Sequence, residues 1–147
     1  MKRITLITAI VLVLSMAFSA VSFAAPETLA LDVTGSASGL LTVTNPANAV
    51  LSSYDKSHNI SGYAANGANV SVYIASGGRY VIMKRNGVPV SCTVGASGMF
   101  VQPVCLNQGR SDILVRAELN GQVQYVKRTV NVLSSNFLNL LKGFNLY

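Results

Sequence analysis

Few residues of this 147-residue chain could carry acid–base or nucleophilic chemistry. It has one histidine, two cysteines and five carboxylates. A Ser–His–Asp hydrolase would have to use His58, with Asp55 and several serines nearby in the sequence. The stretch 52–61 is crowded with polar residues, which is typical of an exposed loop, and the chain has no nucleophile elbow, phosphate loop or zinc-protease motif. We therefore expect a protein that is not an enzyme.

Composition also argues against bound metals and cofactors. One histidine and two cysteines are too few soft ligands for a structural zinc site or an iron–sulfur cluster. The carboxylates are spread along the chain and show no pairing suited to glycoside hydrolysis. The net charge of +6 comes from scattered basic residues, which are weak grounds for nucleic acid binding. We expect no cofactor, no metal ion and no nucleic acid partner.

Cys92 and Cys105 are candidates for one disulfide, because their number is even and export favours oxidation. If residues 95–98 close a hairpin, Cys92 faces Val101. Cys105 then lies four residues further on, about 13 Å away at the rise of a strand, whereas bridged Cα atoms lie within about 7 Å. A bridge would need a bulge near Pro103 or a different pairing. The alternatives are two buried thiols or a redox site, and the latter is disfavoured without a Cys-x-x-Cys spacing.

Tyrosines form a second group of candidate residues. Tyr73 has the outward parity of its segment, since Val72 and Ile74 have the opposite one. Exposed tyrosines on one face would offer a platform for sugar rings or for a protein partner. The alternative is that they are ordinary strand residues. The candidate binding face consists of Tyr63, Tyr73, Tyr80 and Tyr125.

The C-terminal tail, residues 134–147, has an apolar pattern at helical spacing. The apolar residues fall at positions i, i+3, i+4 and i+7, which is one face of a short helix. We expect a helix or arm that folds back over the domain. Otherwise the pattern would be an exposed patch for a partner or a membrane surface. The four residues are Phe137, Leu140, Leu141 and Phe144.

The first 24 residues have the pattern of a secretory signal peptide. Lys2 and Arg3 precede an apolar run, and Ser22-Phe23-Ala24 supplies small residues for cleavage after Ala24. The alternative is a retained membrane anchor, but the run is shorter than the roughly 20 residues of a spanning helix. We expect export without a stable membrane span after cleavage, to the medium or the cell surface, or to the periplasm of a Gram-negative cell. Residues 25–37, rich in small and polar side chains, are expected to be a lead-in or linker.

The exported part has the period-two alternation of β-strands. Turn signals such as Asn120-Gly121 interrupt it about every ten residues, which is typical of an all-β sandwich or barrel. Arg128 shares its parity with Val126 and Val130, so we expect a bulge or bend there. The predicted strands are 40–44, 57–64, 69–75, 79–84, 90–94, 99–105, 112–119 and 122–133.

Four segments in order resemble the bacterial immunoglobulin-like (Big-type) domains of secreted and cell-surface proteins. They are 41–48, 60–73, 94–100 and 106–117, and the resemblance runs across about 38–133. It implies an immunoglobulin-like antiparallel β-sandwich of seven to eight strands over 38–133. The chain departs from the family in a shorter hairpin at 117–121 that lacks the usual Asp, and in a longer, more basic stretch at 79–91. A calcium role is therefore not carried over.

The resemblance implies a structural, adhesion or protein-interaction module at the bacterial cell surface. It does not imply catalysis, and fold analogy alone supplies no partner. The alternative is a module that binds cell-wall or other extracellular polysaccharide through the exposed tyrosines. Either partner, a protein or a polysaccharide, would be met outside the cell.

Overall fold

The structure is a computed structural model that describes residues 24–134 and Asn136. The expected signal peptide, apart from Ala24, and the expected tail helix, apart from Ser134 and Asn136, lie outside the described residues. The described part is built from strands. They are β1 (Thr28–Leu29), β2 (Leu41–Asn45), β3 (Val50–Ser53), β4 (Ser57–Ala64), β5 (Asn69–Ser76), β6 (Arg79–Ile82), β7 (Lys84–Arg85), β8 (Val88–Pro89), β9 (Ser91–Thr93), β10 (Met99–Cys105), β11 (Gly109–Leu119) and β12 (Gln122–Val132).

All eight strands predicted from the alternation are confirmed to within a few residues. The two-residue turn at Asn120-Gly121 is confirmed as well, because both residues have positive φ, 52° and 78°. Strands β1, β3, β7 and β8 were not predicted, since segments of two to four residues are too short to show a period. The expected bulge in the last strand is wrong, because β11 and β12 pair without interruption from Gly109–Val132 to Leu119–Gln122.

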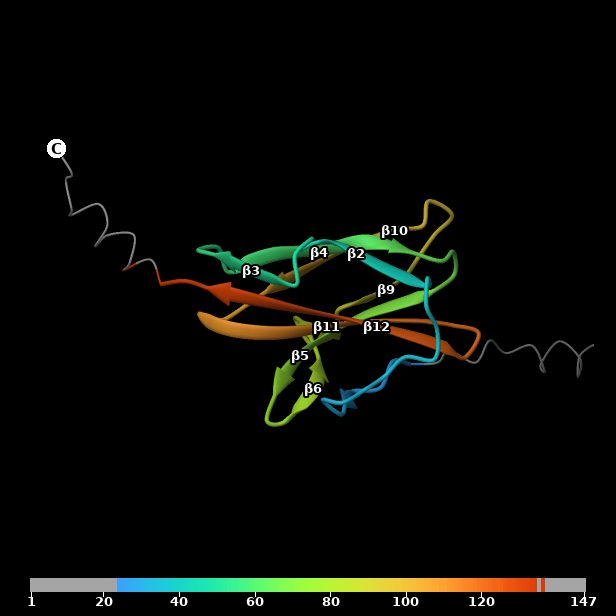
Figure 1. The fold of residues 1–147 in the computed structure, drawn as a ribbon, viewed down its shortest axis with the longest axis horizontal. Coiled ribbons are helices and arrows are strands. Elements are labelled where there is room, and N and C mark those ends of the chain that lie inside the picture. Colours follow the sequence, from blue (N-terminus) through green and yellow to red (C-terminus); the bar gives the residue numbers. More distant parts are fainter. Residues whose placement is uncertain (1–23, 135, 137–147) are drawn as a thin grey trace, which may run out of the picture.

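Two sheets face each other in a sandwich-like arrangement (Figure 1). The larger sheet has the order β1-β6-β5-β11-β12-β3, and β9 also pairs with β5. The smaller sheet has the order β10-β4-β2, and β7 and β8 form a separate hairpin. Neighbouring strands are antiparallel, except that β3 runs parallel to β12. After β2 the chain therefore crosses from the smaller sheet to the edge of the larger one.

The main core lies between the two sheets. Branched and aromatic side chains at alternate positions fill it, as the alternation predicts. Ile60 and Phe100 come from the smaller sheet, and Val72 and Val115 come from the larger one. Each is at most 3% exposed. Burying a side chain of this size stabilises a fold by roughly 1.5–3 kcal/mol, so this core supplies the main driving force.

Two polar side chains of β12 form hydrogen bonds with the backbone of β2 in the smaller sheet and of the residues next to β2. Gln124 Oε1 accepts hydrogen bonds from Leu40 N (2.7 Å) and Leu41 N (2.8 Å), and its Nε2 donates to Leu41 O (3.0 Å). Arg128 Nε donates to Pro46 O (2.9 Å) and its Nη2 to Val43 O (3.1 Å). These contacts satisfy backbone groups from the start of β2 to just past its end, which is why the inward-facing Arg128 needs no bulge.

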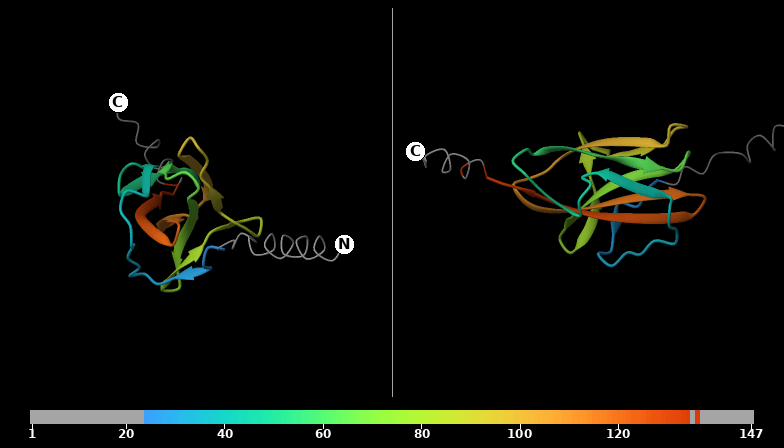
Figure 2. Two further views of the ribbon diagram at one scale, coloured as in Figure 1. Left: turned by 90° about the vertical axis from the view of Figure 1, so that its right-hand side faces the viewer. Right: turned by 45° about the horizontal axis from the view of Figure 1, so that its top comes forward.

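Residues 24–37 lie along the other side of the larger sheet, away from the smaller sheet (Figures 1 and 2). Strand β1 pairs with β6, and Glu27 O accepts a hydrogen bond from Ile82 N (2.9 Å). Ser36 N and Ala37 N both donate to Val123 O, at 2.8 and 3.1 Å. Leu29 and Val33 pack on a second apolar cluster on this face. The segment expected as a lead-in is thus packed on the sheet.

A protruding hairpin interrupts the edge of the larger sheet. β6 pairs with residues 73–76 of β5, and β9 pairs with residues 69–71. Val72 of β5 bonds to the residues on either side of the hairpin. Its O accepts a hydrogen bond from Met83 N (2.8 Å), and its N donates to Val90 O (3.0 Å). Residues 84–89 between them form the β7–β8 hairpin. The hairpin accounts for the extra length of the stretch 79–91, and its first strand carries the basic residues Lys84 and Arg85.

Gly62 is required by a close approach of two strands. It lies inside β4, opposite Val43 of β2. A Cβ on Gly62 would overlap the carbonyl oxygen of Thr42 and come within 2.9 Å of Val43 Cα. The β2–β4 register shifts between Val43 and Asn45, so β2 crosses tightly over this position.

Replacing Gly62 by alanine should force β2 away from β4. We expect a loss of about 3 kcal/mol or more in the free energy of unfolding, because backbone atoms cannot yield as a flexible side chain can. Urea unfolding measures the loss. Gly95→Ala is the matched control, since a Cβ at Gly95 meets nothing within 4 Å. Equal stability of the two variants would contradict the tight crossing.

Candidate functional site

The four candidate tyrosines do not share an exposed face. Tyr73 and Tyr80 are 0% and 5% exposed and belong to the second apolar cluster, together with Ile82 and Leu114. Tyr73 does have outward parity, but residues 24–37 cover it, and its hydroxyl donates to Pro26 O at 2.8 Å. The predicted platform is therefore wrong for these two residues. Burial raises the pKa of Tyr73 to about 12.

Tyr63 is the candidate tyrosine that is clearly exposed. It lies on the outer side of the smaller sheet, directly opposite Met99, and Val101 follows two residues further along β10 on the same side. The three side chains are 52%, 55% and 55% exposed. We call this patch, Tyr63, Met99 and Val101, the open face. Tyr125 is half-buried on the larger sheet, packed against the second apolar cluster.

Cys92 and Cys105 are free thiols in the structure, so the candidate disulfide is not formed in it. The assumed hairpin does not form. β9 pairs with β5 in the larger sheet, whereas β10 pairs with β4 in the smaller one. Residues 95–98 therefore connect the two sheets and do not bring neighbouring strands together. Cys92 is half-buried in β9, which pairs with β5, and Cys105 is exposed at the end of β10.

His58 makes a structural contact in β4. Its Nε2 lies 2.7 Å from the backbone oxygen of Asp55, which can only accept, so the ring nitrogen donates. The partner is thus the main chain of Asp55 and not its carboxylate. A triad requires the base to be oriented by a carboxylate while it faces a nucleophile, and His58 has no such contact among residues 24–134.

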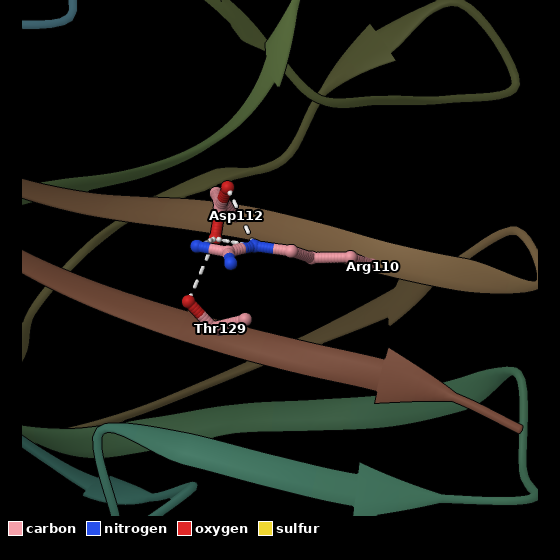
Figure 3. A network of polar contacts seen from close by, with 3 residues as sticks. All are labelled: Arg110, Asp112 and Thr129. Atoms are coloured by element: carbon pink, nitrogen blue, oxygen red, sulfur yellow. Dashed lines mark hydrogen bonds and ion pairs between the residues drawn. The ribbon is translucent and has the colours of Figure 1, made fainter.

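A polar network lies on the outer side of the larger sheet (Figure 3). Asp112 Oδ1 accepts a hydrogen bond from Thr129 Oγ1 at 2.7 Å, and Arg110 Nε lies 3.1 and 3.2 Å from the two carboxylate oxygens. Asp112 and Thr129 are register partners on β11 and β12. The Thr129 hydroxyl, followed by Arg110, lowers the pKa of the Asp112 carboxyl.

Arg116 and Glu118 form a buried pair that was not predicted from the sequence. They lie on the outer side of β11, where the Arg116 Nη2 contacts Glu118 Oε2, and Arg116 is 6% exposed. Burial opposes the charge on Arg116, but the hydrogen bonds that it donates to Glu118 and Tyr125 outweigh this effect and raise the guanidinium pKa. The i, i+2 spacing of opposite charges in a strand was the available signal.

Phe137, Leu140, Leu141 and Phe144 lie outside the described residues. Within 24–134 and 136, no three His, Cys, Asp or Glu side chains come together to hold a metal ion. The same residues contain no helix with the length and apolarity to cross a bilayer.

No protein-family model and no curated protein matches this chain.

Replacing Asp112 by asparagine should weaken the fold at neutral pH. The folded-state pKa of Asp112 is lowered, so its contribution is present above the unfolded value of about 3.9 and is lost as the pH falls through the folded value. The side chain is 36% exposed, and solvent screening limits the effect to about 1 kcal/mol.

Urea unfolding of the parent chain and Asp112→Asn at pH 7, and again well below pH 4, measures the difference. We expect the gap between them to close in acid. Asp55→Asn is the control, because no ion pair involves Asp55 within the described part of the chain. A gap that persists unchanged in acid would contradict the role of the ionised Asp112 carboxylate.

Proposed function

We propose that the chain is an exported, non-enzymatic immunoglobulin-like module that binds a protein partner at the bacterial cell surface. The observation that carries this proposal is the open face. One outer side of the sandwich is covered by residues 24–37, whereas the other carries three large, exposed apolar side chains.

The strand order supports the immunoglobulin-like part of the proposal. In constant-type immunoglobulin domains the first, second and fifth strands share one sheet, and the third strand lies beside the last two in the other. Here β2, β4 and β10 form the smaller sheet in that adjacency. β5, β11 and β12 are neighbours in the larger sheet. A strand equivalent to the fourth strand of those domains is absent between residues 94 and 99, where the chain passes directly to β10.

The composition of the open face supports a protein partner. Tyrosine and methionine are enriched where proteins meet, and an aromatic ring flanked by apolar side chains is a common anchor. Tyr63, Met99 and Val101 are neighbours on two paired strands and together form one exposed apolar area. Thr42 and Thr44 of β2 and Ser61 of β4 lie on the same side of the sheet. The apolar patch thus has polar neighbours on the side of β2.

Polysaccharide binding is the second candidate, and Tyr63 is the residue that favours it. A single exposed aromatic ring can stack on one sugar ring. Tyr73 and Tyr80 are buried, so they cannot extend such a site. A row of stacked sugars would need further exposed rings beside Tyr63. The protein partner therefore remains the better-supported proposal.

The test is binding of the fluorescently labelled, exported protein to intact cells of the host bacterium. We expect saturable binding that protease treatment of the cells removes. The triple variant Tyr63→Ser/Met99→Ser/Val101→Ser should bind at least about tenfold more weakly, because the anchor of an interface commonly contributes 2 kcal/mol or more. All three positions are exposed, so the melting temperature should change little.

Val88→Ser is the matched control, since Val88 is 65% exposed on the β8 side of the protruding hairpin. Binding that survives protease but disappears after digestion of the cell wall would favour the polysaccharide candidate. Equal binding by the parent chain and the triple variant would contradict a role of the open face.

A further inference from the structure

The covered side of the larger sheet contains a polar cavity. It has a volume of about 320 Å³ and is lined in part by Ala24 and Ala25, where residues 24–37 begin to cover the sheet. Most of its lining is polar and comes from three neighbouring strands. The residues that matter are Asn69 and Ser71 of β5, Ser91 and Thr93 of β9, and Arg116 of β11.

Strand register places these side chains in two adjacent rows. Ser71 lies between its register partners Ser91 and Arg116. In the next row, Asn69 lies between its register partners Thr93 and Glu118. Residues two apart on a strand point to the same side, so both rows face the cavity. The floor of the cavity is therefore built on paired strands, which hold the polar groups rigidly.

Two buried groups at this floor lack a hydrogen-bond partner. Within the described residues, Ser71 Oγ and Arg116 Nε make no hydrogen bond. Ser71 is 1% exposed and Arg116 is 6% exposed. Buried polar groups are nearly always paired, and leaving one unpaired is costly. Both unpaired atoms belong to residues that line the same cavity, and each can donate a hydrogen bond.

The other polar groups are also set up to donate. Thr93 Oγ1 donates to Asn69 Oδ1 at 2.7 Å, which leaves the amide nitrogen of Asn69 free to donate into the cavity. Glu118 contacts the Nη2 of Arg116, whereas the Nε has no hydrogen-bond partner among the described residues. A ligand here must therefore offer acceptors, and one of them should be negatively charged because it meets a guanidinium.

We propose that this cavity binds an acidic sugar through its carboxylate. The carboxylate accepts hydrogen bonds from Arg116 Nε and Ser71 Oγ, and the sugar hydroxyls meet Ser91 and the Asn69 amide. Glu118 already balances one charge on Arg116. In the exported form expected to begin at Ala25, Ala24 no longer lines the cavity, and the new α-ammonium group of Ala25 adds a positive charge there that offsets the ligand's carboxylate.

The site is independent of the open face. It lies on the outer side of the larger sheet, whereas the open face lies on the smaller sheet. Ligand binding at the cavity can therefore be lost and measured separately from partner binding at the open face. A carboxylate alone, a neutral sugar and an inorganic anion each satisfy only part of the donor set, so they serve as comparison ligands.

The test uses the isotope-labelled exported protein, with its N-terminus verified by mass spectrometry. The amide signals of Ser71, Ser91 and Arg116 are followed while D-glucuronate, D-glucose, acetate and inorganic phosphate are added separately. We expect saturable shifts with D-glucuronate at millimolar concentrations, and at least tenfold weaker binding of the other three. Equal binding of D-glucose or of phosphate, or no shift with D-glucuronate, would overturn the proposal.

Ser71→Ala separates binding from folding. Removing an unpaired buried hydroxyl should leave the melting temperature unchanged or raise it, while D-glucuronate binding falls at least tenfold. Ser52→Ala on β3 is the matched control and should bind like the parent chain. Arg116→Lys should also weaken binding at least tenfold, because lysine lacks the Nε donor. Parent-like binding by a folded Ser71→Ala variant would overturn the assignment.

Discussion

Strands β5 and β11 are buried on both faces, and this double burial constrains the rest of the fold. Val72 and Val115 on one side, and Tyr73 and Leu114 on the other, are each 0% exposed. A sheet buried on both faces needs two covering layers. The smaller sheet supplies one layer, and residues 24–37 supply the other. The N-terminal segment is therefore part of the fold, with its own hydrogen bonds to β6 and β12.

The polar cavity and the exposed apolar patch both lie where the covering layers of the two sheets end. Next to Ala25 the larger sheet carries Arg116, Ser71 and their polar neighbours, which together form the cavity. Where β12 meets β2, the side chains of Gln124 and Arg128 form hydrogen bonds with the backbone of residues 40–46. The outer side of the smaller sheet has no covering segment among residues 24–134, and there the apolar open face remains in contact with solvent. The same arrangement of covered and uncovered sheet faces thus accounts for the fold and for both proposed binding sites.

Alternation in the sequence predicted the eight main strands, because each keeps one side in the core over several residues. It also assigned Tyr73 the correct side of its strand, but it could not show that a segment nearly fifty residues earlier covers that side. The cysteine pairing failed for a similar reason, since a loop such as 95–98 joins neighbouring strands or crosses between sheets with the same residues. The role of Arg128 depends on where β2 ends, which local periodicity does not encode.

The titration of Tyr73 tests the double burial most directly. Tyrosinate absorbance of the parent chain, compared with that of Tyr73→Phe, gives the pKa of this hydroxyl. Because residues 24–37 bury it, the pKa should be about 12 in the complete exported chain. Deleting residues 26–33 should return it to near 10, the ordinary value for an exposed tyrosine. A value near 10 in the complete chain, or one that stays near 12 after the deletion, would contradict the covering role of the N-terminal segment.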